Sequence, residues 1–329
     1  MLKARKSCST KYRTILIWVS STFIFSFFFL MASRNTVTIT TMTSQASEAV
    51  EDYSKQRTEL YEKMSRDLHE HGAAFLAGGE TSQSLSLSDL FTLNNGLVTP
   101  VLKVADPPVR ANVLHLSPKF SHPISQIVKR VFLPHFDKAI WFQDENLYHF
   151  SMFHASHHLE PVSATAEECC CYNQVDLEAS AVEEVARTSC PLKIRLERVV
   201  LTSTGVLLGC WQFINGTEPA IIRSKLKTAL PRAPKNQLYN PVMLHTSFAR
   251  VLGCPRVMDG CQSINTKAMH TSEDMLRFFH ELVSQMNKEL QGFEATVSEI
   301  WFVEEFDVLA LALNGRIKSR KFHFKCLVT

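Results

Sequence analysis

The sequence VMLHTSFAR, at residues 242–250, has the composition of a short strand, because it is mostly apolar or hydroxylated and contains neither Gly nor Pro. Successive side chains of a strand point to opposite faces. His245 and Ser247 therefore share one face, whereas Leu244 and Phe248 share the other. A core beneath the second face would hold the imidazole and the hydroxyl over a groove on the first.

A second stretch repeats this arrangement ninety-six residues earlier. In YHFSM, residues 148–152, His149 and Ser151 share one face and three large apolar residues share the other. Imidazole titrates near neutral pH and can act as general base or general acid. Two such strands facing each other would bring together two imidazoles and two hydroxyls, which is enough to open a phosphodiester without a metal. The repeat therefore predicts an active site built from two distant strands.

The His-x-Ser/Thr triplet alone is weak, because five of the thirteen histidines begin one. His115 precedes a Ser-Pro pair that breaks a strand, and His270 lies at the expected start of a helix, where the next residues can cap it. His154 is followed by His157 and His158, so three imidazoles fall within five residues. No acidic or Cys ligand stands nearby at zinc-site spacing. We therefore expect a solvated strand end there and no metal site.

The paired motifs resemble those of the 2H phosphoesterase superfamily, which contains RNA 2′,3′-cyclic phosphodiesterases, RNA-ligase-like proteins and the cyclic nucleotide phosphodiesterases of plants. Its signature is two copies of hydrophobic-His-x-Thr/Ser-hydrophobic, separated by a helix, a strand pair and another helix. Residues 148–152 and 244–248 match it, and Ala249-Arg250 continue the second copy as the family's second motif often does. The resemblance covers roughly residues 95–329 and is closest in type to a plant, membrane-anchored member. Ser replaces the commoner Thr in both copies, and Thr246 replaces a usual apolar residue.

The resemblance implies a bilobed α+β fold in which two antiparallel-rich sheets flank a central groove and each lobe contributes one motif. His149 and His245 would be catalytic, one as base and one as acid, in an order that the sequence does not fix. Ser151 and Ser247 would donate hydrogen bonds to the non-bridging phosphate oxygens, and Arg250 is a further candidate phosphate contact, with a surface arginine as its alternative. The expected substrate is a cyclic phosphate or 2′,5′-type phosphodiester of a nucleotide or RNA end, with no cofactor and no metal. The alternative is a catalytically inactive module that binds a nucleotide or a protein.

Elements of both kinds alternate along the chain and include clear hairpins, which argues for α+β and against a doubly wound parallel sheet. The chain has 329 residues, of which 45% are hydrophobic, and a net charge of +3, so it can bury a substantial core. We expect helices over 124–136, within 161–189, over 219–231 and over 272–290, strands over 148–153 and 242–248, a hairpin over 192–214, and two or three strands within 295–324 turning at Asn314-Gly315.

The N-terminus reads as a membrane anchor. Residues 1–14 are basic and contain no acid, and residues 15–31 carry no charge. The length of this uncharged segment is at the short end of the ~17–25 residues that span a bilayer. The basic flank predicts a cytoplasmic tail and a translocated C-terminal domain, and so a single-pass type II protein whose domain is lumenal, in the endoplasmic reticulum or Golgi, or extracellular. A cleaved signal peptide is the alternative.

Residues 32–94 are expected to form a Ser/Thr-rich stem with one helical segment at 51–70, which packs on the domain or pairs with a second copy. The Gly/Ser-rich interval 72–100 reads as a linker, so the folded domain, residues 95–329, is expected to begin near residue 95.

Three further features bear on the protein's surroundings. Asn215 heads the one N-x-Ser/Thr sequon with an allowed middle residue and is a candidate glycosylation site on the lumenal side. The eight cysteines after the apolar segment are compatible with disulfides or with buried thiols, and the sequence leaves both readings open. Trp301 or Phe302 is a candidate for stacking on a base at the groove rim, with core packing as the alternative.

Overall fold

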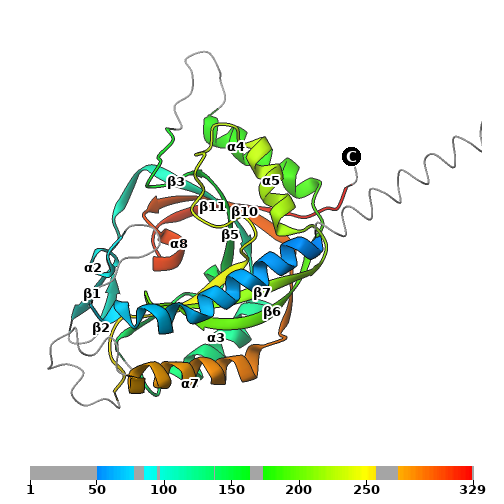
Figure 1. The fold of residues 1–329 in the computed structure, drawn as a ribbon. Coiled ribbons are helices and arrows are strands. Elements are labelled where there is room, and N and C mark those ends of the chain that lie inside the picture. The colour runs from blue at the N-terminus through cyan, green and yellow to red at the C-terminus, as the bar shows by residue number, and fades with distance from the viewer. Residues whose placement is uncertain are drawn as a thin grey trace, which may run out of the picture. The chain divides into compact units, whose positions relative to one another are not determined.

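The structure is a computed structural model that describes residues 50–77, 85–94, 97–136, 138–163, 173–256 and 273–327 (Figure 1). The chain divides into two compact units, Met1–Tyr53 and Ser54–Thr329. In the first unit only residues 50–53 are described, and they are helical. The folded domain is the second unit, which begins well before residue 95 because the helix that continues to residue 71 belongs to it.

The fold is α+β, with two main sheets in which every neighbouring pair of strands is antiparallel. A four-stranded sheet has the order β11-β10-β3-β5, a five-stranded sheet has the order β4-β8-β7-β6-β9, and β1 and β2 form a separate hairpin. The strands are β1 Phe91–Asn94, β2 Leu97–Pro100, β3 Val104–His115, β4 Ile140–Phe142, β5 His149–Ser156, β6 Leu192–Leu201, β7 Val206–Asn215, β8 His245–Val251, β9 Glu294–Val297, β10 Glu299–Asp307 and β11 Ile317–His323.

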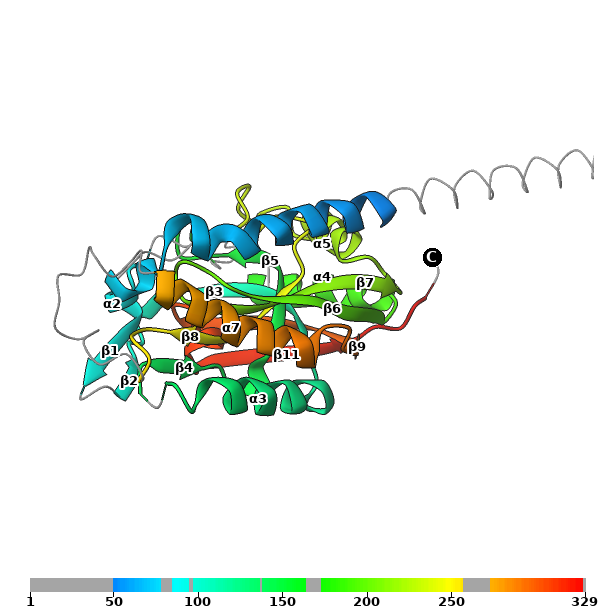
Figure 2. The same ribbon diagram turned by 60° about the horizontal axis from the view of Figure 1, so that its bottom comes forward.

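Helices cover both faces of each sheet (Figures 1 and 2). The helices that the structure bounds are η1 Ala74–Ala77, α2 Leu87–Leu90, α3 Pro118–Phe132, η2 Glu145–Leu147, α4 Gln174–Arg187, α5 Pro219–Ala229, α7 Glu273–Leu290 and α8 Ala310–Leu313. α4 and α5 pack against each other and against one face of the four-stranded sheet. α3 and α7 pack together against one face of the five-stranded sheet, at β8 and β6. α8 covers the opposite face of the four-stranded sheet. The helix of residues 54–71 covers the opposite face of the five-stranded sheet, at β6 and β7.

Several boundaries follow directly from local sequence. Pro219 opens α5 at the first helical position, where its missing N–H costs nothing, and the Glu218 side chain accepts a hydrogen bond from the Ala220 N–H. The turn between β6 and β7 contains Gly205 at a φ of +83°, and a Cβ there would meet the Val251 carbonyl oxygen at 2.2 Å. The expected hairpin, the Pro219 helix and the helix ending at Leu290 are confirmed.

Other expectations were wrong. The interval 72–100 is not a linker, because it contains η1, α2 and the β1–β2 hairpin and buries Phe75, Leu87 and Phe91 in the main core. Asn314, at a φ of 55°, caps α8 rather than forming a two-residue hairpin turn, so β10 and β11 are joined through that helix. The long central strand β3 was not among the expected elements, and its first five residues include Pro107 and Pro108.

The expectations for residues 1–49 and for Cys169-Cys170-Cys171 lie outside the described residues, and this includes the apolar segment 15–31. Within the part of the chain that the structure describes, no helix is long and apolar enough to cross a membrane. Cys190 and Cys326 form a disulfide, Cys254 is also disulfide-bonded, and Cys210 is a buried free thiol. Both of the open readings of the cysteines are therefore represented.

Candidate active site

The two motif strands lie beside each other, where the four-stranded and five-stranded sheets meet. β5 begins at His149 and β8 begins at His245. Phe150 and Phe248 are fully buried in the main core on one side of these strands. The alternating residues His149, Ser151, His245 and Ser247 all line one recess on the other side. The structure therefore brings together the four side chains that the sequence pairs.

The recess has a cavity volume of about 70 Å³. Pockets that enclose a drug-sized ligand usually measure ~300 Å³ or more, so this space admits a small polar group and not a whole nucleotide. Besides the motif residues, its wall is made by Val109, Ala111, Val113, Gln143, His154, His157, His158, Leu238, Tyr239, Glu305, Leu309, Leu311 and Ala312. Most of these come from β3, α8 and the segments that follow β5 and precede β8.

The turn before β5 fixes the orientation of His149. Its Nδ1 lies 2.7 Å from the Leu147 carbonyl oxygen, and a carbonyl can only accept, so Nδ1 carries the proton. The Gln143 side chain donates to the same carbonyl at 3.1 Å, which holds the turn in place. The Nε2 of His149 is left as the ring nitrogen with a lone pair.

Burial keeps both motif imidazoles neutral. It lowers the pKa of His149, against the opposing effect of the Leu147 hydrogen bond. The pKa of His245 is lowered to about 3, mainly by burial and in smaller part by the neighbouring His149 and Arg223. The Tyr239 ring packs against His245 with ring centroids 5.1 Å apart. The two imidazoles are close enough that protonating one opposes protonating the other.

The histidines that follow the first motif of β5 are part of the recess, so the expectation of a solvated strand end there was wrong. His154 and His157 are 8% and 2% exposed. The Gln237 side chain accepts from the His154 N–H at 2.8 Å and donates to its carbonyl at 3.1 Å, and His157 Nε2 lies 3.0 Å from the Asn236 carbonyl oxygen. Burial lowers the pKa of His154 to about 3. No cluster of three or more His, Cys, Asp or Glu suited to a metal occurs in the described ranges.

Glu305 is a recess residue that sequence reasoning missed. It is 6% exposed, and its Oε2 accepts a hydrogen bond from the Leu311 N–H of α8 at 3.0 Å. Burial raises its pKa to about 7, against the effect of hydrogen bonds from α8 backbone. The one signal available was the pair of adjacent acids, Glu304 and Glu305, within the apolar run of residues 300–306, which also suits a solvated strand edge.

Arg223 is a second residue that was missed, and it joins the two motifs from behind. Its guanidinium is buried and donates to four backbone carbonyls: Met152 at 3.2 Å, Ser151 at 2.9 Å, Pro241 at 2.7 Å and Met243 at 2.6 Å. Burial lowers its pKa to about 10. The one signal in the sequence was its place next to Ile222 on the apolar stripe of α5, which does not show the carbonyls that it contacts.

Three other candidate residues lie elsewhere. Arg250 does not line the recess, and its Nη1 donates to the Thr204 carbonyl at 3.4 Å. Trp301 is 5% exposed, with His115 stacked on it at 3.9 Å and the Lys321 ammonium 4.1 Å from its ring centroid, so its ring is not open to a base. Asn215 is exposed as the last residue of β7.

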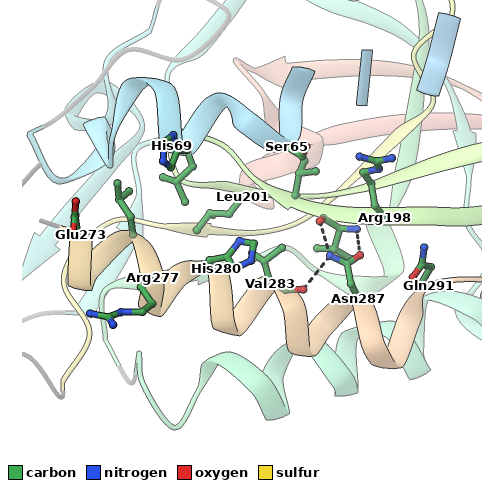
Figure 3. Close-up of a pocket in the computed structure, with 14 residues that line it drawn as sticks. Ser65, His69, Arg198, Leu201, Glu273, Arg277, His280, Val283, Asn287 and Gln291 are labelled. Carbon is green, nitrogen blue, oxygen red and sulfur yellow. Dashed lines mark hydrogen bonds between the residues drawn. The ribbon is translucent and has the colours of Figure 1, made fainter. Parts of the chain in front are cut away.

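A larger cavity, of about 740 Å³, lies between the helix of residues 54–71, the edge of β6 and α7 (Figure 3). None of the paired motif residues lines it. Along its wall, the Asn287 side chain accepts from the Val199 N–H at 2.7 Å and donates to the Val199 carbonyl at 3.0 Å (Figure 3). Asn287 thus bonds the Val199 N–H and carbonyl on the edge of β6, which an additional strand would otherwise use for pairing.

No protein-family model matches the sequence, and no curated protein matches it. Solved structures are similar at low identity. TT0787 of Thermus thermophilus is 11% identical, with 66% of this chain and 98% of that chain covered and a TM-score of 0.41. LigT of E. coli, solved with NADP+, is 11% identical, with 68% and 99% covered and a TM-score of 0.36. A structure described as a phosphoesterase is 12% identical, with 66% and 98% covered and a TM-score of 0.36. At such TM-scores the likeness supports no argument about the reaction or the substrate.

Proposed function

We propose that this chain is a 2H phosphoesterase that hydrolyses a cyclic phosphate or a 2′,5′-type phosphodiester of a nucleotide or RNA end without a metal. The observation that carries the proposal is that His149, Ser151, His245 and Ser247, from two strands distant in sequence, line one recess. Paired imidazoles supply the base and the acid that phosphodiester hydrolysis needs, and paired hydroxyls supply donors to the charged oxygens.

His149 is assigned as the general base. The Leu147 carbonyl holds its proton on Nδ1, so Nε2 can take a proton from water as the water oxygen bonds to phosphorus. His245 is then the general acid, which protonates the ribose oxygen as the bond from phosphorus to that oxygen breaks. The products are a phosphomonoester and a free hydroxyl.

Bound substrate would supply the charge that an acid role for His245 requires. Without substrate, burial is the main cause that lowers the pKa of His245 to about 3, so the ring is neutral. A phosphodiester anion placed beside it favours the charged imidazolium and raises that pKa. Protonation of His245 is therefore coupled to substrate binding.

The size of the recess limits what enters it. With about 70 Å³ available, the phosphodiester occupies the recess and the nucleoside stays outside. The competing function is a binding module that holds a nucleotide phosphate, or another protein, in the same recess without turnover.

The test is hydrolysis of 2′,3′-cyclic nucleotides by the purified full chain in EDTA. We expect turnover that falls about 10²- to 10⁴-fold in His149→Ala and in His245→Ala. His323→Ala is the matched control, because that imidazole lies on β11, is 74% exposed and is outside the recess. Turnover that persists in both motif variants would remove the assignment. Binding of cyclic nucleotide without turnover on cyclic or 2′,5′ substrates would establish the binding module.

We further propose a single-pass type II topology, with residues 15–31 as the anchor and the domain in the lumen or outside the cell. The Cys190–Cys326 disulfide supports an oxidising compartment, and the exposed Asn215 supports glycan addition. Protease protection of the domain in intact microsomes, with a glycosidase-sensitive mass that Asn215→Gln abolishes, is the expected result. Digestion of the domain without detergent would place it in the cytoplasm instead.

A further inference from the structure

The segment that leads into the second motif, residues 241–244, contains no helix or strand, yet buried side chains hold it firmly. Tyr61 is fully buried, and its hydroxyl accepts from the Leu244 N–H at 3.0 Å. The same hydroxyl lies 2.9 Å from the Trp211 carbonyl oxygen and 2.8 Å from the Leu244 carbonyl oxygen, either of which can accept its proton. Tyr61 thus stands between two backbone groups that would otherwise pair across β7 and β8, one residue before His245.

Arg57, one turn earlier on the same helix, reaches the same segment. Its Nη1 donates to the Val242 carbonyl at 3.4 Å. The guanidinium also pairs with both carboxylate oxygens of Glu218, at 2.6 and 3.0 Å, and both side chains are buried. Glu218 is the residue that caps the N-terminus of α5, so Arg57 fixes the start of that helix.

α5 in turn carries Arg223, which completes the contacts. Arg223 donates to the carbonyls of Pro241 and Met243 on one side and to Ser151 and Met152 on the other. A single nitrogen, Nη2, contacts both Ser151 and Met243. It therefore ties the first motif strand directly to the approach to the second.

We propose that Tyr61, Arg57 and Arg223, here called the 241–244 clamp, are positioning residues that set His245 opposite His149. The inference rests on the proposed function for its catalytic meaning. Helix residues 54–71 lie outside the region that resembles the 2H family, yet they supply two of the three clamp residues. The helix of residues 54–71, expected from the sequence to lie in a stem, is thus part of the folded domain and supports the active site from behind.

Tyr61→Phe in the full chain tests the clamp, because it removes one oxygen and leaves the ring packed against Val200, Leu208 and Cys210. We expect kcat on a 2′,3′-cyclic nucleotide to fall about 10- to 100-fold with KM nearly unchanged, since a small displacement of a catalytic group costs rate and not binding. Glu62→Gln, an exposed neighbour on the same helix, is the control and is expected to match the wild type.

Amide hydrogen exchange supplies a readout that does not depend on activity. In Tyr61→Phe we expect faster exchange at residues 242–247 and unchanged exchange across β5, residues 149–156. Arg57→Lys provides a second variant, with the same expected pattern. If the wild-type protein shows no turnover, the proposed function is wrong. The exchange pattern still tests whether the clamp residues hold the backbone before His245. Exchange and kcat equal to those of Glu62→Gln would overturn the clamp, and faster exchange with unaltered kcat would overturn its role in positioning His245.

Discussion

The strands β5 and β8 present the same pair of side chains but are positioned by different means. β5 pairs with β3 from Arg110 to His115, and a turn immediately before it orients His149. β8 follows an irregular segment whose backbone is held by Tyr61 and Arg57, which are 183 and 185 residues away in sequence. Both motifs are therefore set in a sheet, since His245 pairs with Cys210 of β7, but the approach to the second motif is held in addition by side chains of a distant helix. Substitutions behind the second motif should consequently be the more damaging.

The largest expected effect is that of Arg223→Met, which breaks the contact that β5 and β8 share. The carbonyls of Pro241 and Met243 lie in irregular backbone, and their loss of a buried donor is expected to lower the free energy of unfolding by about 3 kcal/mol. Urea unfolding measures the loss. Lys227→Met, an exposed change on the same helix, should stay within about 0.5 kcal/mol of wild type. A loss of that small size for Arg223→Met would mean that β8 does not depend on the contact.

Removing the motif hydroxyls compares the two strands at the recess itself. The side-chain hydroxyls of Ser151 and Ser247 have no hydrogen-bond partner among the described residues, so both are available to substrate. Each Ser→Ala change should lower kcat by about 10²-fold, as for loss of one donor to a developing oxyanion. Ser→Thr keeps the donor and should retain activity in steady-state assays. Full activity in both alanine variants would contradict the role of the hydroxyls.

The two sheets should also respond to pH in opposite directions. On β8, the pKa of His245 is about 3 in the folded protein and 6.5 in the unfolded protein. Its contribution to the free energy of unfolding is therefore fully present above pH 6.5 and is lost as pH falls towards 3. On β10, the pKa of Glu305 is about 7 in the folded protein and 4.5 in the unfolded protein. Its contribution to the free energy of unfolding is therefore fully present below pH 4.5 and is lost as pH rises through 7.

Thermal melts of matched variants separate these contributions. His245→Gln should lessen the loss of Tm between pH 6.5 and pH 4, whereas Glu305→Gln should raise Tm relative to wild type at pH 8 more than at pH 5. If the Tm of a variant differs from that of the wild type by the same amount at every pH, the pKa of the replaced group does not differ between the folded and unfolded states.

The smallest effect concerns the buried side of β8. Thr246 is fully buried, and its hydroxyl has no hydrogen-bond partner in the part of the chain that the structure describes. Thr246→Val keeps the shape and removes an unpaired polar group, so the free energy of unfolding should rise by about 1 kcal/mol with kcat unchanged. Urea unfolding and a steady-state assay check both parts. Destabilisation would indicate that the hydroxyl is paired in solution.

The sequence by itself determined the features that depend on near neighbours. Alternation within residues 148–152 and 242–250 placed two imidazoles and two hydroxyls on the correct strand faces, and Pro219 and Gly205 marked a helix start and a turn. Only the tertiary structure decided that Glu305 lines the recess, that Arg223 joins the two motifs from behind, and that residues 54–71 support His245. A charged side chain within an apolar pattern looks the same whether it reaches solvent or a buried backbone group, because the sequence does not show which other segment folds against it.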